Sequence, residues 1–427
     1  MGKAFKCILL LLLVIPVLSG CVMTTVEQLY CLPQRLEEYE NVRAVIDKAM
    51  QGMTYSAPIY GDNRHVIQAA DLDGDGVDEY LVFANDNSDR PLKIMIFCQL
   101  ASGCVLMDTI EGYGFGFDFV AYAQMDDRPG VELIVGRQVS NQVMRSVSVY
   151  RFSSGFARQL LNTSYNELIT TDMDLDGTSE LFVLTSGLSE NSAGNAKLFT
   201  YQDGELQRSV EIPLSAPMTE FKRLESGMLQ DGLPAIYVTS ASDHQRLALD
   251  IFVVADGNLQ NFAKGITLPS IDNYYIYSQD VDDDGILELP RLVPLSSLED
   301  TDPPQYMIEW YTLDSNKQEV KKSVTFHNYS QNWYLVLDSM SISSLSVRQG
   351  EAGCSFFYSG EKMVTILALT DADREEQSGL PGRVVLYGSE TVIYVAILEN
   401  EELEQNITQE LFTRFHPIRM ELNTEED

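Results

Sequence analysis

The chain has 427 residues, and 45% of them are hydrophobic, which is enough to bury the cores of two or three domains and excludes a disordered tail. Its formal net charge of −34 opposes binding to nucleic-acid phosphates and to anionic lipid headgroups. The same charge favours cations, basic partners or neutral ligands, although solubility of an exported protein explains it at least as readily.

The first 20 residues have the pattern of a lipoprotein signal peptide. Lys3 and Lys6 precede an apolar run over 7–18, which is too short for a permanent membrane helix, since a span needs about 20 residues. The run ends in Leu-Ser-Gly-Cys at 18–21, which resembles the bacterial lipobox. The resemblance implies cleavage before Cys21 and lipid on its sulfur, so the protein is expected on the extracytoplasmic face of the cell membrane. The alternative is ordinary secretion with Cys21 free.

Residues 21–57 are predicted to be a tether with a short amphipathic helix. Within 34–50 one helical face collects the larger apolar side chains, which are Leu36, Tyr39, Val42, Val45, Ile46 and Ala49. Such a face predicts a helix packed on the edge of the following domain, in preference to a helix that binds a partner.

An acidic loop followed by an apolar strand recurs along residues 58–330. Three copies are complete, at 71–79, 172–180 and 280–288, and two are degenerate, at 125–132 and 230–235. Glu79, Glu132, Glu180, Ala235 and Glu288 are spaced by 53, 48, 55 and 53 residues. A period of about 50 residues suits four short antiparallel strands, which must stack on neighbouring sheets to bury both faces. The sequence therefore predicts a mainly β fold, a β-propeller.

The complete loops have the form Asp-x-Asp-x-Asp-Gly-x-x-Glu, which predicts a calcium site in each. Carboxylates at the first, third, fifth and ninth positions and the carbonyl of the seventh form an oxygen cage, which Ca²⁺ prefers, whereas Mg²⁺ demands a tighter octahedron. The predicted ligands are Asp71, Asp73, Asp75, Val77, Glu79, Asp172, Asp174, Asp176, Thr178, Glu180, Asp280, Asp282, Asp284, Ile286 and Glu288. The alternative is an unmetallated turn rich in Asp and Gly.

The two degenerate loops are expected to bind no metal. Arg128 occupies the fifth position of the loop that closes at Glu132. In the loop before Ala235, Gly227 and Leu229 stand where carboxylates are needed.

The three complete loops resemble the FG-GAP or VCBS repeats of integrin-like β-propellers, over about residues 60–330. The resemblance implies that the calcium is structural and clamps each loop between strands of a blade. With Leu32-Pro33 before the repeats and Trp333 after them, the layout resembles VCBS-repeat lipoproteins of Gram-positive gut bacteria, for which the resemblance implies no particular activity.

Residues 331–427 are predicted to form a separate, small α+β domain, because the repeat stops there. The expected strands are 333–337, 341–347, 354–358, 363–369 and 391–398, followed by a helix over 407–415. Farther upstream, Cys98 and Cys104 flank an expected hairpin turn, where a disulfide and two buried free thiols are both open.

No catalytic residues are predicted. His65, His244, His327 and His416 have no partner spacing, and the sequence contains no GxSxG, HExxH or phosphate-binding glycine loop. We therefore expect a surface binding or scaffold module for a protein or glycan partner and no nucleic acid. The alternatives are an extracytoplasmic enzyme acting on carbohydrate or cell-wall polymer, and an assembly factor for a membrane machine.

Overall fold

The computed structural model is mainly β and describes most of the chain between residues 37 and 418. The described ranges are 37–139, 145–187, 192–208, 210–217, 220–241, 246–271, 274–299, 303–337, 342–350, 353–398 and 414–418. The predicted signal peptide, Cys21 and His244 lie outside these ranges.

Three antiparallel sheets follow one another in the first half of the described chain. Sheet 1 contains β1 (Thr54–Tyr55), β2 (Ile67–Ala70), β3 (Glu79–Asn85), β4 (Leu92–Leu100) and β5 (Gly103–Gly112). Sheet 2 contains β6 (Gly116–Ala123), β7 (Glu132–Gln138), β8 (Arg145–Ser153) and β9 (Phe156–Tyr165). Sheet 3 contains β10 (Glu167–Thr171), β11 (Glu180–Thr185), β12 (Ala193–Gln202), β13 (Glu205–Arg208) and β14 (Ile212–Pro217).

Three larger sheets and one small one make up the second half. Sheet 4 contains β15 (Glu220–Met228), β16 (Pro234–Ala241), β17 (Leu247–Ala255) and β18 (Asn258–Leu268), and β19 (Ser270–Ile271) pairs with β20 (Tyr274–Tyr275). Sheet 5 contains β21 (Leu289–Pro294), β22 (Tyr306–Leu313), β23 (Glu319–Asn328), β24 (Trp333–Val336) and β30 (Phe415–Pro417). Sheet 6 contains β25 (Leu345–Gly350), β26 (Gly353–Tyr358), β27 (Glu361–Leu369), β28 (Arg383–Gly388) and β29 (Ile393–Leu398).

Helical segments are short and few among the described residues. They are α3 (Glu37–Ala49), α4 (Arg374–Ser378) and the 3-10 turns η2 (Tyr329–Gln331) and η3 (Ile342–Ser344).

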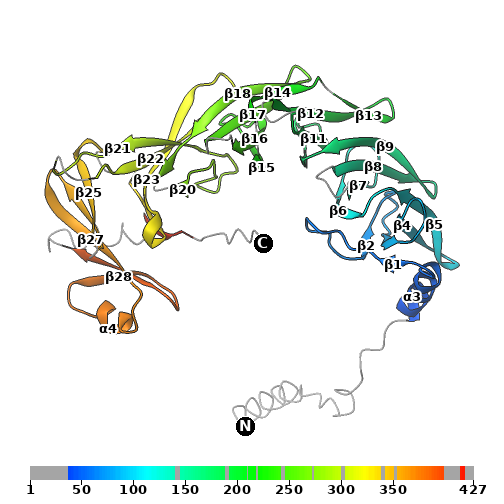
Figure 1. The fold of residues 1–427 in the computed structure, drawn as a ribbon, viewed down its shortest axis with the longest axis horizontal. Helices are drawn as coiled ribbons and strands as arrows, with labels where there is room; N and C mark the ends of the chain where they lie inside the picture. Colours follow the sequence, from blue (N-terminus) through cyan, green and yellow to red (C-terminus); the bar gives the residue numbers. More distant parts are fainter. Residues whose placement is uncertain are drawn as a thin grey trace, which may run out of the picture.

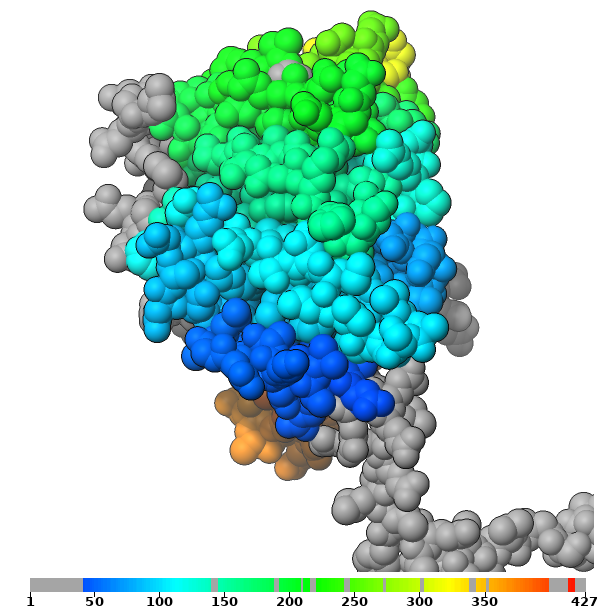
Figure 2. Space-filling model, turned by 90° about the vertical axis from the view of Figure 1, so that its right-hand side faces the viewer, coloured from blue at the N-terminus to red at the C-terminus, as the bar shows by residue number. Residues whose placement is uncertain are grey.

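The sheets stack face to face in chain order along an open arc (Figure 1). Each neighbouring pair of sheets encloses its own core, so that Phe83 of sheet 1 meets Phe117 of sheet 2 edge to face, and Phe182 of sheet 3 meets Phe252 of sheet 4. Strands such as β16 are buried along their whole length because sheets cover both faces, which explains why apolar residues point to both faces in the run 235–238. Figure 2 shows these layers from the N-terminal end of the arc.

Helix α3 covers the outer face of sheet 1, as its apolar face predicted. Ile46 and Met50 are buried against Val82, Met95 and Phe97, which point away from sheet 2. This is the face that a closed ring would turn toward its last blade. Among the described residues, no core joins sheet 1 to sheet 6, and the two sheets stand at opposite ends of the arc in Figure 1.

The expected domain boundary between residues 330 and 331 falls inside sheet 5. Asn328 of β23 pairs with Trp333 of β24, and a tight turn through Asn332, whose φ is 57°, joins the two strands. One core then packs Phe326 of sheet 5 on Phe356 of sheet 6, with ring centroids 5.3 Å apart. Residues on both sides of the boundary therefore share a sheet and a core.

The helix predicted over 407–415 is not found at its last residue, which begins a strand. Phe415 lies in strand β30 and pairs with Leu335 of β24, because its ring fills the core beside Trp333. Residues 407–413 lie outside the described residues.

The packing of α3 predicts that Ile46→Ala destabilises the protein by about 2–5 kcal/mol, because the change removes a buried side chain from a close-packed site. Arg43→Ala is the matched control, since Arg43 lies on the exposed side of the helix and pairs only with Asp47, an interaction of about 0.3–0.5 kcal/mol. Urea denaturation followed by tryptophan fluorescence and circular dichroism measures both. Equal effects of the two substitutions would contradict the packing of α3 as a cover for sheet 1.

Candidate metal centres

The acidic loops occur at the same place in successive sheets. The loop at 71–79 joins β2 to β3 in sheet 1, the loop at 124–132 joins β6 to β7 in sheet 2, and the loop at 172–180 joins β10 to β11 in sheet 3. The loop at 280–288 precedes β21, the first strand of sheet 5. We call these the first, second, third and fifth loops. The fourth loop connects β15 and β16 of sheet 4.

In four of these loops the closing glutamate holds the loop through one carboxylate oxygen. The Oε2 atom accepts a hydrogen bond from the backbone N–H at the second loop position. These bonds are Leu72 to Glu79 (2.9 Å), Met125 to Glu132 (2.8 Å), Met173 to Glu180 (2.7 Å) and Val281 to Glu288 (2.9 Å). The other oxygen, Oε1, is left for a different partner.

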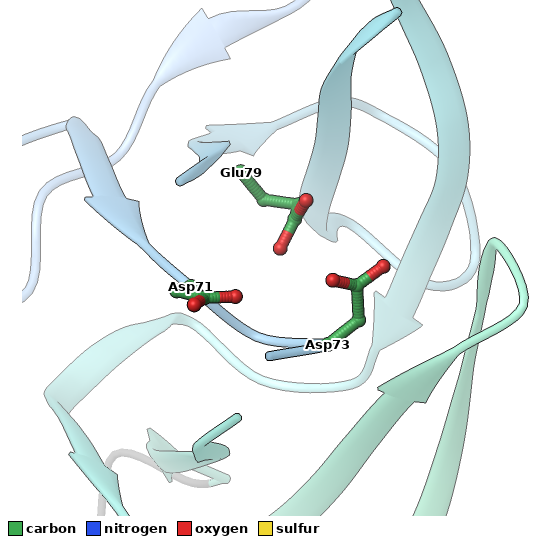
Figure 3. Close-up of side chains that lie close together, drawn as sticks. All are labelled: Asp71, Asp73 and Glu79. Atoms are coloured by element: carbon green, nitrogen blue, oxygen red, sulfur yellow. The ribbon is translucent and has the colours of Figure 1, made fainter. Parts of the chain in front are cut away.

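Three loops bring three carboxylates together. The groups are Asp71, Asp73 and Glu79, then Asp172, Asp174 and Glu180, then Asp280, Asp282 and Glu288, and within each group one oxygen per residue lies within 4.8 Å of the others. Figure 3 shows the oxygens of the first group turned toward a common point. The structure thus assembles the first, third and ninth positions of each predicted ligand set.

The backbone of each complete loop bends through two residues with positive φ. In the first loop these are Gly74 (77°) and Gly76 (87°), and in the third they are Leu175 (62°) and Gly177 (92°). The turn points loop amides inward, so that Gly74 and Gly76 donate hydrogen bonds to the two oxygens of Asp71, at 2.7 and 3.0 Å. The glycine at the sixth position thus supplies the bend that the sequence motif requires.

The fifth and seventh positions hydrogen-bond to each other. Asp75 accepts from the amide of Val77 at 2.8 Å. The matching pairs are Asp176 with Thr178 (2.8 Å) and Asp284 with Ile286 (2.9 Å). Ligation by these carboxylates and by the carbonyls of Val77, Thr178 and Ile286 stays a prediction. Asp284 also forms an ion pair with Lys322 of β23, at 2.8 Å.

The electrostatics of the three groups favour a cation. The pKa of Glu180 and that of Glu288 are raised to about 7, chiefly by burial and also by the neighbouring aspartates, against a backbone hydrogen bond that lowers them. Asp172 Oδ1 and Glu288 Oε1 are buried without a hydrogen-bond partner. Because all donors are oxygens, a hard divalent ion such as calcium fits them.

The fourth loop is one residue shorter than the others, which corrects its sequence alignment. Gly227 pairs with Ala235, whereas Ala70 pairs with Glu79. Met228 therefore stands at the first position, and Leu229 at the second, where it is buried in the core between sheets 4 and 5. Among the described residues, the second and fourth loops assemble no group of three acidic side chains.

Cys98 and Cys104 are free thiols on opposite faces of sheet 1. Cys98 faces the core toward sheet 2, where burial raises the pKa of its thiol to about 12, and Cys104 faces helix α3. Gln99 pairs with Cys104 across the hairpin, so the alternation of side chains separates the two sulfurs. The disulfide alternative is therefore excluded in this structure.

The described histidines do not assemble with other catalytic groups. His65 is exposed, and His327 is buried between Tyr334 and Trp310, where burial lowers its pKa to about 3. His416 stacks on the other face of Tyr334, with ring centroids 4.8 Å apart. Sequence reasoning missed one charged side chain, Arg151 of β8, whose signal is a single arginine within the apolar strand 146–152.

No protein-family model and no curated protein matches the chain. Solved structures to which the chain is similar include a rhamnogalacturonan lyase from Bacillus licheniformis, at 12% identity and a TM-score of 0.31, covering 71% of this chain and 67% of that one. Sqt1 from Chaetomium thermophilum is 12% identical with a TM-score of 0.31, covering 73% and 74% of the two chains. Neither likeness is close enough to indicate a function. Within the described residues, no helix is long and apolar enough to cross a membrane.

The raised glutamate pKa values predict a pH-dependent effect of Glu180→Gln. Because the folded pKa of about 7 lies above the unfolded value of about 4.3, ionisation of Glu180 costs stability as pH rises between these values when no metal is bound. In chelator, the melting temperature of the variant minus that of wild type should increase from pH 5 to pH 8. In millimolar calcium at pH 8 the variant should be the less stable. A difference that does not change with pH in chelator would contradict this account.

Proposed function

We propose that this chain is a lipid-anchored bacterial surface protein whose β-propeller-like body is stabilised by calcium and serves as a binding or scaffold module. The observation that carries the proposal is the recurrence of one acidic group, built from the same three loop positions, in three stacked sheets. Metal ions repeated along a stack have a structural role, because each clamps a loop between strands. The FG-GAP and VCBS resemblance of the loops supports the same role.

The loops connect calcium to the packing of the sheets. In the first three loops, the second-position residues, which the closing glutamates hold, place their side chains in the cores between sheets, as Leu72 and Met173 do. Loops of adjacent sheets also bond directly, since Val131 donates to the carbonyl of Asp71 at 3.2 Å and Ser179 donates to that of Gln124 at 2.7 Å. Binding of a cation in a loop therefore stabilises the contact with the next sheet.

The type of partner is inferred from charge and from the lack of assembled catalytic groups in the described residues. A net charge of −34 disfavours nucleic acid. The proposal is a protein or glycan partner outside the membrane, with the lipid on Cys21 as the anchor.

Calcium dependence is tested by thermal melting. Each occupied site is expected to contribute about 2.7 kcal/mol at a calcium concentration 100 times its Kd, so chelator should lower the melting temperature by several degrees. Combined Asp73→Asn, Asp174→Asn and Asp282→Asn should remove this response. The matched control combines Asp89→Asn, Asp203→Asn and Asp256→Asn, which change the same number of exposed aspartates outside the acidic groups. A chelator-independent melt of the wild type would overturn the proposal of structural calcium.

The binding role is tested by affinity purification of the lipidated protein from detergent-solubilised membranes, first in calcium and then in chelator. A stoichiometric protein partner that is lost in chelator is the expected result, and arrays of glycans test the other partner class. The Cys21→Ser variant should leave the membrane fraction and appear in the soluble fraction. Failure to retain any protein or glycan, together with hydrolysis of a cell-wall polymer, would replace the binding role with an enzymatic one.

A further inference from the structure

The second loop keeps two of the acidic side chains of the complete loops. Asp126 stands at the third position and Glu132 at the ninth, and they are 1% and 2% exposed. The first position is Gln124, whose amide nitrogen donates to the backbone carbonyls of Asp126 and Arg128. Two buried carboxylates without a cation would be strongly unfavourable.

Arg151 supplies that cation from within the chain. It lies on β8, and the register that pairs Leu133 with Tyr150 places it opposite Glu132. Its Nη1 atom donates to Glu132 Oε1 at 2.9 Å and to Asp126 Oδ2, and the side chain is buried. Since Glu132 Oε2 already accepts from Met125, the guanidinium uses the oxygen that the complete loops leave for a metal.

The same strand position carries a short side chain in the sheets that have an acidic group. By register, the residues opposite Glu79, Glu180 and Glu288 are Cys98, Thr200 and Thr312. In the fifth loop, Glu288 Oε1 is buried without a hydrogen-bond partner, whereas the equivalent oxygen of Glu132 is bonded to Arg151. At equivalent positions, the second loop thus has an arginine beside its glutamate, and the complete loops have a group of three carboxylates with a short side chain opposite.

We propose that Arg151 takes the place of the metal ion in the second loop, so that this loop stays closed without calcium while the first, third and fifth loops need it. The comparison with the first, third and fifth loops rests on the proposed calcium sites. The hydrogen bonds of Arg151 to the second loop are independent of those sites. The second loop is bonded to both the first and the third through Val131 and Ser179. It therefore acts as a metal-independent junction between two metal-dependent loops.

Hydrogen exchange with mass spectrometry on the full chain tests the proposal loop by loop. In wild type, chelator should speed exchange in the first, third and fifth loops and leave the second loop unchanged. Arg151→Met should speed exchange in the second loop about 100-fold in calcium and in chelator alike, because it leaves two buried carboxylates without a cation. Arg158→Met, at an exposed arginine on the adjacent strand β9, should change nothing there.

A second experiment converts the site. Gln124→Asp, Arg128→Asp, Pro129→Gly and Arg151→Thr together recreate the complete loop pattern, with glycine at the sixth position and threonine as in sheets 3 and 5. This fourfold variant should raise the number of bound calcium ions from three to four in equilibrium dialysis. Arg151→Met with unchanged second-loop exchange, or a wild-type second loop that opens in chelator as the others do, would overturn the role of Arg151. If chelator affects no loop but Arg151→Met still opens the second, the calcium proposal fails and the role of Arg151 stands. If the fourfold variant does not fold, the exchange results decide alone.

Discussion

The repeated loops depend on one glutamate carboxylate whose two oxygens interact with different partners. The closing glutamate binds a backbone N–H with one oxygen and needs a positive charge on the other, because both oxygens are buried. The residue whose N–H is bound is also the one whose side chain fills the core between sheets, as Leu72, Met125 and Met173 do. Neutralising one oxygen therefore stabilises the loop, the core residue and the contact between two sheets together.

In our proposal, the chain uses two kinds of positive charge for the same purpose. A divalent ion suits three converging carboxylates, whereas a guanidinium suits the two in the second loop. A bound metal would make the stability depend on the concentration of that metal, whereas an arginine does not. In this view the stack contains sheets that respond to calcium next to one that does not.

The open arc follows from how its first sheet is covered. Helix α3 buries Ile46 and Met50 against the face of sheet 1 that points away from sheet 2, so this face has no need of a further sheet. At the other end, sheet 6 packs on sheet 5 through a core that includes Trp333 and Phe356. This shared core makes sheet 5 and sheet 6 parts of one stack.

The sequence by itself determined the features that lie within a few residues of one another. Each acidic group comes from one nine-residue loop, so its spacing showed where Asp71, Asp73 and Glu79 would converge, and the apolar runs after the loops showed the buried strands. Only the tertiary structure decided what depends on the pairing of one strand with the next. The register of β7 with β8 sets Arg151 against Glu132, that of β15 with β16 shortens the fourth loop, and that of β4 with β5 separates Cys98 from Cys104. A shift of one residue in a strand turns every side chain to the other face, and the register is set jointly by the turn and by the apolar faces of both strands when they pack.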